Sequence, residues 1–335
     1  MRSLVSTVLA LPLLAAGGPV AAGSVQTDFG VYEYVMQRAS GTVDDAGRAV
    51  ESALAAGGWR VLGKVDAGAP EGCRFKARVL AAVEPEYAAR LMAANRRTAP
   101  FAVVDRINVF EDEDGVHVAV LNAESVTRTV LMQDAAFADL SRTHVDALRA
   151  LVIGAVEGKA IHREFGEKRS RGYIGKTMGV MAGGSFDEKV KDEAMVPSAD
   201  WKAVAAKVRQ GLTQPGGKWG LHIAYELNLP EQETVIFGST GTPMDSKSFS
   251  IVGAGADPAR DSFQCPGLAH AAAYPIEVVV TREGASVKVR LVDTMYRMKM
   301  YFEDAGKWAF MKNMGMPGSV HDELLAQIKA GLALP

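Results

Sequence analysis

The sequence predicts an α+β protein of two tandem related two-layer sandwiches, each a largely antiparallel sheet with helices on one face. Three observations lead to this prediction. The chain has 335 residues, which is about two domains of ordinary size. Stretches that alternate between apolar and polar residues, as half-buried strands do, stand between stretches with helical spacing. Segments of the first half also recur in the same order in the second half, which is typical of an internal duplication.

Three pairs of segments carry this internal similarity. One pair shares two glycines shortly before a tryptophan, one shares a proline after an apolar run, and one has the alternation of a β-hairpin. The pairs are LAAGGWRVLGK (54–64) with TQPGGKWGLHIAY (213–225), RVLAAVEPEYA (78–88) with SIVGAGADPAR (250–260), and RINVFEDEDGVHVAVLN (106–122) with PIEVVVTREGASVKVRL (275–291). We therefore divide the chain into a signal peptide, a first copy, a linker and a second copy, at residues 1–23, 24–158, 159–185 and 186–335.

The N-terminus predicts export. Arg2 is followed by an apolar run from Leu4 to Ala16 and then by small residues, which is the order of a secretory signal peptide. The run is shorter than the roughly 20 residues that a bilayer-spanning helix needs. We expect cleavage between Ala21 and Ser24, and a soluble periplasmic or secreted protein without a membrane anchor.

The first copy opens with a predicted strand and helix. GVYEYVMQRAS (30–40) alternates as a strand does. Thr42 and Asp45 have the spacing of a capping box at a helix N-terminus. Gly57 and Gly58 would end this helix, because glycine accepts the left-handed backbone of a helix end. Two strands, a second helix, a hairpin and a last helix follow.

The second copy is predicted to repeat this order of elements. Asp200 would cap a helix whose apolar face is formed by Trp201, Val204, Ala205, Val208 and Leu212. The hairpins would turn at Gly115 in the first copy and at Gly284 in the second. We expect the closing helices over about residues 135–157 and 320–332. The segment between the copies is charged, rich in glycine and aperiodic, as a linker is.

A family resemblance accompanies this organisation. The segment VLAAVEPEYAARLMAANRRTAPFAVVDRINVFEDEDGVHVAVLNAES (79–125) resembles the domain-of-unknown-function 302 family, and the second copy looks like a diverged relative. The family's Asn-Pro at a helix start is Glu84-Pro85 here, and its Pro-Cys before the penultimate strand is replaced by Val104-Asp105. The resemblance implies a fold and little about function, and these departures argue against a thiol-dependent role.

Charge and cysteine content limit the function further. The formal net charge is −2, and charges of both signs are mixed along the chain, so we expect no nucleic-acid partner. Cys73 and Cys265 are the two cysteines. In an oxidising compartment such a pair favours a disulfide, which would join the two copies; buried free thiols are the alternative.

Common catalytic motifs are missing from the sequence. There is no GxxxxGK[ST], HExxH or CxxC motif, and GAGADP (253–258) has a proline where a dinucleotide fingerprint has its third glycine. The histidines stand singly, and a single histidine is more often a satisfied structural residue than a ligand; they are His117, His144, His162, His222, His270 and His321. The sequence therefore favours a non-enzymatic protein.

The segment MYRMKMYFEDAGKWAFMKNMGM (295–316) holds six of the fourteen methionines. Read as a strand, its first part would place Tyr296, Met298, Met300 and Phe302 on one core face. Trp308, Met311 and Met314 would follow on the buried face of a helix that Gly315, Pro317 and Gly318 end. Packing explains these methionines, because methionine fills irregular gaps and contacts aromatic rings. The alternative is a Cu(I) or haem site, since thioether sulfur is a soft ligand that suits Cu(I); its candidate ligands are Met298, Met300, Met311, Met314, Met316 and His321.

Three function hypotheses follow from these observations. The leading one is an exported binding or accessory protein without a cofactor. It would hold an unknown small ligand or a periplasmic partner protein in the groove between the copies, with the methionine-rich segment as one wall. The second is Cu(I) or haem handling through residues 295–316. The third is an enzyme whose acids and histidines come together only in the fold.

Overall fold

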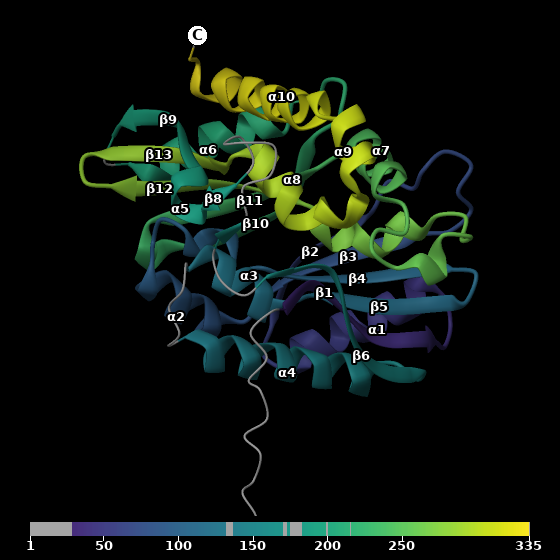
Figure 1. The fold of residues 1–335 in the computed structure, drawn as a ribbon. Helices are drawn as coiled ribbons and strands as arrows, with labels where there is room; N and C mark the ends of the chain where they lie inside the picture. The colour runs from purple at the N-terminus through teal and green to yellow at the C-terminus, as the bar shows by residue number, and fades with distance from the viewer. Residues whose placement is uncertain are drawn as a thin grey trace, which may run out of the picture.

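The computed structural model describes residues 29–131, 137–169, 173–174, 183–198, 200–214 and 216–334, and Figure 1 shows the chain as a ribbon. The predicted signal peptide lies outside the described residues. We call residues 29–169 the first half and residues 183–334 the second half. The helices and strands of the first half are β1 (Phe29–Ala39), α1 (Val43–Ala56), β2 (Arg60–Asp66), β3 (Ala77–Val83), α2 (Pro85–Ala94), β4 (Asp105–Asp112), β5 (Gly115–Leu121), α3 (Ala123–Val130), α4 (Ala138–Ala155) and β6 (Lys159–Arg169).

The rest of the described chain forms the second half and, before it, the short strand β7. Its elements are β7 (Tyr173–Ile174), β8 (Gly184–Ser185), α5 (Phe186–Lys189), β9 (Val190–Pro197), α6 (Trp201–Leu212), β10 (His222–Leu229), β11 (Thr234–Thr240), α7 (Thr242–Val252), the 3-10 helix η5 (Pro266–Ala273), β12 (Ile276–Glu283), β13 (Ser286–Val292), α8 (Thr294–Phe302), α9 (Lys307–Lys312) and α10 (Gly315–Leu332).

Each half is built on one antiparallel sheet, which confirms the predicted α+β class. The first sheet has the strand order β2-β3-β4-β5-β1-β6, and the second has the order β10-β11-β12-β13-β9. Each pair of neighbouring strands runs antiparallel. In Figure 1, α1 and α4 lie on the lower, outer side of the first half, and α6 and α10 lie on the upper, outer side of the second. The two sheets thus lie in the middle of the molecule, between two layers of helices.

Local signals in the sequence locate several element ends correctly. The Thr42 side chain accepts a hydrogen bond from the backbone N–H of Asp45 at 3.2 Å, and the Asp45 carboxylate accepts one from the N–H of Thr42 at 3.1 Å, so the capping box is present. Asp200 accepts from the N–H of Ala203 at 2.9 Å and caps α6. Gly58, with φ of +90°, follows the end of α1 in the left-handed backbone region.

The predicted linker is partly a strand, which corrects its boundary. Residues Lys159–Arg169 form β6 and pair with β1 at the edge of the first sheet. An edge strand keeps charged side chains in solvent without cost. The high charge of this segment therefore hid its strand character from the sequence analysis.

The second of the three segment pairs does not match in the structure. Residues 78–83 belong to strand β3, whereas residues 250–252 end helix α7. The strand that occupies the place of β3 in the second sheet is β11. Pro85 and Pro243 both stand in the first turn of the helix after these strands. Proline is common at that position in unrelated helices, so the match of Pro85 with Pro258 had no structural basis.

The last helix also begins earlier than expected. Gly315, Pro317 and Gly318 lie in the first turns of α10 instead of separating two helices. Proline is tolerated there because the first backbone N–H groups of a helix have no partner within it. Farther along, α10 crosses α6 closely at Gly331, where an added Cβ would lie 2.2 Å from the carbonyl oxygen of Lys207.

The two halves are joined through the inner face of the first sheet. Asn108 on β4 donates to the carbonyl oxygens of Leu268 and Ala269 on η5, at 2.8 and 3.1 Å. Cys73, in the loop after β2, forms a disulfide with Cys265 directly before η5, with a Cα–Cα distance of 6.0 Å. Because both partners of this bond come from different halves, it ties the second half covalently onto the first.

Within the described ranges, no helix combines the length and the apolar character needed to cross a membrane.

Candidate functional site

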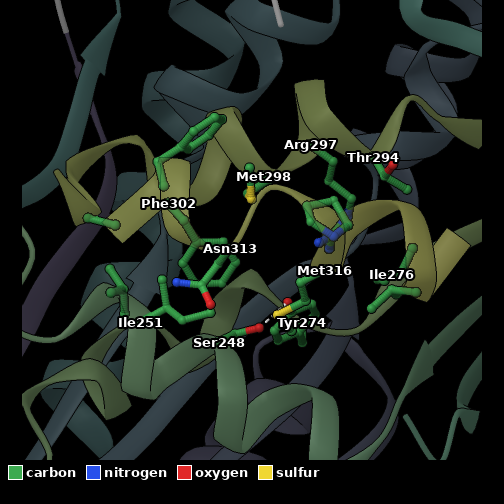
Figure 2. Close-up of a pocket in the computed structure, with 15 residues that line it drawn as sticks. Ser248, Ile251, Tyr274, Ile276, Thr294, Arg297, Met298, Phe302, Asn313 and Met316 are labelled. Atoms are coloured by element: carbon green, nitrogen blue, oxygen red, sulfur yellow. Dashed lines mark hydrogen bonds between the residues drawn. The ribbon is translucent and has the colours of Figure 1, made fainter. Parts of the chain in front are cut away.

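An apolar pocket opens among helices α7, α8, α9 and α10 of the second half (Figure 2). The space between its walls is about 640 Å³, including the part open to solvent, and about 60 Å³ of it admits the centre of a water-sized molecule. The second volume is small beside the roughly 300–1,000 Å³ of common small-molecule pockets, but the site shares with them apolar walls and a few polar groups. The lining residues are Ser248, Ile251, Val252, Tyr274, Ile276, Thr294, Arg297, Met298, Phe302, Ala305, Phe310, Asn313, Met316, Pro317 and Val320.

The wall formed by residues 294–302 is helix α8, and the predicted strand is wrong. The Asp293 carboxylate accepts a hydrogen bond from the backbone N–H of Tyr296 at 3.0 Å and so caps the first turn. Apolar and polar residues alternate here over too few positions to exclude a helix, and the capping aspartate was the signal that could have identified it.

The helical geometry changes which methionine side chains share a face. Residues four apart lie on the same side of a helix, and residues two apart do not. Thr294, Met298 and Phe302 therefore line the pocket together. Met300, which we expected beside Met298, is instead buried on another side of α8 with 2% of its surface exposed.

Two of the six predicted metal ligands meet in the pocket. Met298 and Met316 both reach into it from different helices, as Figure 2 shows. Met311 is 39% exposed, Met314 does not line the pocket, and the Nε2 atom of His321 lies 3.7 Å from a carboxylate oxygen of Glu193. Among the described residues, no group of three or more histidine, cysteine, aspartate or glutamate side chains is arranged to hold a metal ion.

A hydroxyl pair provides one polar point in the pocket. Ser248 Oγ and Tyr274 Oη lie 2.7 Å apart, and Ser248 Oγ also donates to the carbonyl oxygen of Met244 at 2.9 Å. Burial raises the pKa of Tyr274 to about 12, so the phenol is protonated at neutral pH. With the Ser248 proton directed at Met244, the Tyr274 hydroxyl is the donor within the pair.

The buried guanidinium of Arg297 provides the second polar point. Its Nη2 atom donates to the carbonyl oxygens of Ala273 and Pro275, at 2.5 and 2.9 Å. Its Nε atom has no hydrogen-bond partner in the described part of the chain and lies 3.6 Å from Glu277 Oε2. Arg297 is only 5% exposed and lines the pocket, so it places a positive charge in the pocket wall.

A second arginine makes this region electropositive. Arg106, on β4 of the first half, places Nη1 3.0 Å from Glu277 Oε1 and is 1% exposed. Burial would lower the pKa of Arg106, but the Glu277 carboxylate and nearby phenols outweigh it and raise that pKa, so the guanidinium stays charged. Two guanidinium groups thus share the single carboxylate of Glu277, and one of them, Arg297, lines the pocket.

Helix α9 covers the pocket, and its orientation differs from the prediction. Phe310 and Asn313 line the pocket at this helix. Trp308, expected to be buried, is 73% exposed, and Met311 is 39% exposed. The spacing of Trp308 and Met311 does place them on one side of the helix, but that side faces solvent. Spacing alone does not tell whether an apolar stripe is covered.

A separate, polar groove lies where we had expected a binding site, between the halves. It is lined by Lys64, Val65 and Asp66 on β2 and by His222, Ile223, Ala224, Thr240, Thr242 and Asp245 of the second half. Asp245 is 2% exposed and accepts hydrogen bonds from Thr240 Oγ1 at 2.7 Å and from the backbone N–H of Gly68 at 3.2 Å. Burial raises the pKa of Asp245 from 3.8 to about 7. The apolar pocket, in contrast, lies entirely within the second half.

Three buried histidine–aspartate pairs escaped the sequence analysis, because their partners are distant in the chain or hidden in a hairpin. The ring nitrogens lie 2.8 to 2.9 Å from the carboxylates in the pairs His117–Asp112, His144–Asp105 and His270–Asp304. The carboxylates have further partners, such as Arg260 on Asp112 at 2.9 Å. These residues line neither the pocket nor the groove, and we interpret them as structural.

Comparisons with known proteins add little to this description. No family model and no curated protein sequence matches the chain. A solved structure described as an uncharacterized conserved protein DUF302 from Bacillus stearothermophilus is similar, with 14% sequence identity, 37% of this chain and 98% of that chain covered, and a TM-score of 0.33. Membership of tandem domains in that family stays a prediction.

Proposed function

We propose that the protein binds a small amphipathic molecule in the pocket among α7, α8, α9 and α10. The observation that carries this proposal is the combination of apolar walls with one buried, incompletely paired guanidinium. Met298, Phe302, Phe310 and Met316 offer flexible and aromatic surface to an apolar body. Arg297 offers a positive charge to a polar end.

The charge of the site selects the polar end of the ligand. Arg106 and Arg297 share the Glu277 carboxylate, and an acceptor that carries negative charge would complete this arrangement. A hydrogen bond to a charged group contributes about 1.5–3 kcal/mol. A carboxylate with a short apolar chain, such as a short-chain fatty acid, therefore fits the pocket better than an alcohol or amine of the same length.

Export remains part of the proposal. The disulfide between Cys73 and Cys265 supports it, because disulfides persist mainly in oxidising compartments.

The proposed binding site differs from the first expectation, since it lies within the second half and not in the groove between the halves.

The test is direct binding of a fluorescent fatty acid to the purified protein, followed by displacement with unlabelled molecules. Ala305→Phe should fill the pocket and abolish binding, whereas Met195→Phe, at an exposed position on β9, should leave binding unchanged. A carboxylate should displace the probe at lower concentration than the alcohol of equal chain length. Absence of saturable binding, or equal binding by the Ala305→Phe variant with an unchanged thermal transition, would overturn the proposal.

Cu(I) handling is a second candidate, favoured by the two thioethers in the pocket. Cu(I) titration against a competing chelator tests it. Met298→Leu combined with Met316→Leu should remove binding, and Met311→Leu, on the exposed side of α9, should not. Binding that is absent, or that both variants keep, would leave these methionines as apolar wall residues.

A further inference from the structure

We propose that helix α9 docks the protein onto an anionic lipid surface, from which the pocket receives its ligand. The docking surface is the outer side of α9. Delivery of a ligand from the lipid to the pocket rests on the proposed function. The outer side exposes Lys307, Trp308, Met311 and Lys312. We call these four residues the α9 patch.

The composition of the α9 patch matches a lipid interface. Trp308 is 73% exposed, whereas Trp59, Trp201 and Trp219 are each at most 7% exposed. A tryptophan is most stable where its ring is in an apolar layer and its N–H can reach water, which is the condition at a membrane surface. Amphipathic helices that lie in the interface combine such aromatic residues with lysines.

The charge around α9 favours anionic lipid. The helix carries Lys307 and Lys312 and no acidic residue. Two acids precede it, but each is engaged: Glu303 pairs with Lys299 at 3.0 Å, and Asp304 pairs with His270 at 2.9 Å. Although the whole chain has a formal charge of −2, the surface that α9 offers is locally positive.

A protein partner fits the α9 patch less well than lipid does. A stable protein–protein interface buries about 800 Å² on each partner, and four side chains of a six-residue helix supply only a fraction of that area. A lipid surface needs no matching shape, so a small patch of one tryptophan, one methionine and two lysines is sufficient for weak, reversible binding.

The α9 patch is coupled to the pocket because both belong to one short helix. Phe310 on α9 and Asn313 directly after it form part of the pocket wall, while Trp308 and Met311 face outward. Gly306, with φ of +80°, precedes the helix, and an added Cβ there would meet no atom within 4 Å. Because the outer side and the pocket side belong to the same short helix, docking of the outer side would place the pocket wall next to the acyl chains. An amphipathic ligand would come from those chains.

Vesicle binding tests the proposal with a local optical signal. Trp308 is the exposed tryptophan, so its insertion should shift the emission of the protein to shorter wavelength in phosphatidylglycerol vesicles and not in phosphatidylcholine vesicles. Salt should reverse the shift. Lys307→Gln with Lys312→Gln should weaken binding by about thirtyfold. Trp308→Ala should lose the shift and much of the co-sedimentation, and Met195→Ala, also an exposed methionine, should behave as the unaltered protein.

The outcomes separate this inference from the proposed function. All proteins compared must have the same N-terminus, because the apolar run of residues 4–16 would itself bind lipid. Ala305→Phe should bind vesicles while losing the fatty acid in vesicle-free solution. No emission shift with anionic vesicles, or a shift that the Lys307 and Lys312 substitutions leave unchanged, would overturn the docking proposal even if fatty acid binding is retained. Binding of the α9 patch to another protein without vesicle binding would overturn it as well.

Discussion

Arg106 and Arg297 donate hydrogen bonds to the same two carbonyl oxygens, those of Ala273 and Pro275, although each arginine comes from a different half of the chain. Both also lie beside Glu277. This buried contact connects the interface between the halves to the wall of the pocket. A ligand that engages Arg297 would therefore act on the same group that holds the halves together.

Removal of the shared carboxylate should be strongly destabilising. Glu277→Gln would leave two buried guanidinium groups without a counter-charge, and breaking a buried pair in this way costs about 3–5 kcal/mol. The free energy of unfolding in urea measures the effect. Glu51→Gln, which removes an exposed ion pair with Lys64, should change it by less than about 1 kcal/mol. Equal effects of the two substitutions would contradict this assignment.

The disulfide should contribute substantially to stability. Cys73 and Cys265 are 192 residues apart. Linking such distant points restricts the unfolded chain, which typically raises the free energy of unfolding by about 2–4 kcal/mol. Cys73→Ser with Cys265→Ser should lower the free energy of unfolding by that amount, and a reducing agent should have the same effect on the unaltered protein alone. If the reducing agent leaves the transition unchanged, the bond does not form in solution.

Two helical glycines should respond oppositely to alanine. At Gly331 an added Cβ would lie 2.2 Å from the Lys207 carbonyl oxygen, whereas at Gly154 it would meet no atom within 4 Å. Gly331→Ala should force α6 and α10 apart and cost about 1–3 kcal/mol. Gly154→Ala should be neutral or stabilising by up to about 1 kcal/mol. Thermal denaturation compares the two, and a tolerant Gly331 would mean that the helices do not cross closely.

Asp245 should make stability depend on pH. Burial raises its pKa from 3.8 to about 7, so the folded protein retains a proton that the unfolded chain releases. The contribution of Asp245 to stability is therefore lost as pH rises from about 4 to about 7, at up to about 1.4 kcal/mol per pH unit. Asp245→Asn removes this dependence and can keep both hydrogen bonds.

The measurement is the difference in unfolding free energy between the variant and the unaltered protein across that pH window. The difference should grow in favour of Asp245→Asn as pH rises. Asp261→Asn, at an exposed aspartate, should show a difference that stays constant. A constant difference for Asp245→Asn too would show that its carboxyl titrates normally.

By itself, the sequence determined the features that depend on neighbours along the chain. The capping box at Thr42, the cap at Asp200 and the apolar face of α6 follow from spacings of three or four residues, and the structure has each of them. The antiparallel α+β class follows from the same local patterns. Signals of this kind are readable because hydrogen bonds and side-chain faces within one turn or strand do not need the rest of the fold.

Only the tertiary structure decided which apolar and charged groups meet. The face of α9 that carries Trp308 has the apolar spacing of a buried helix, but none of the described elements covers it. Met298 and Met316 line the same pocket from different helices, while Met300 lies on another side of α8. Arg106 reaches Glu277 across 171 positions of sequence (277 − 106). Such contacts depend on how the halves and their helices pack. The same packing decides which charged groups are buried and which of them remain unpaired, and the local sequence pattern does not.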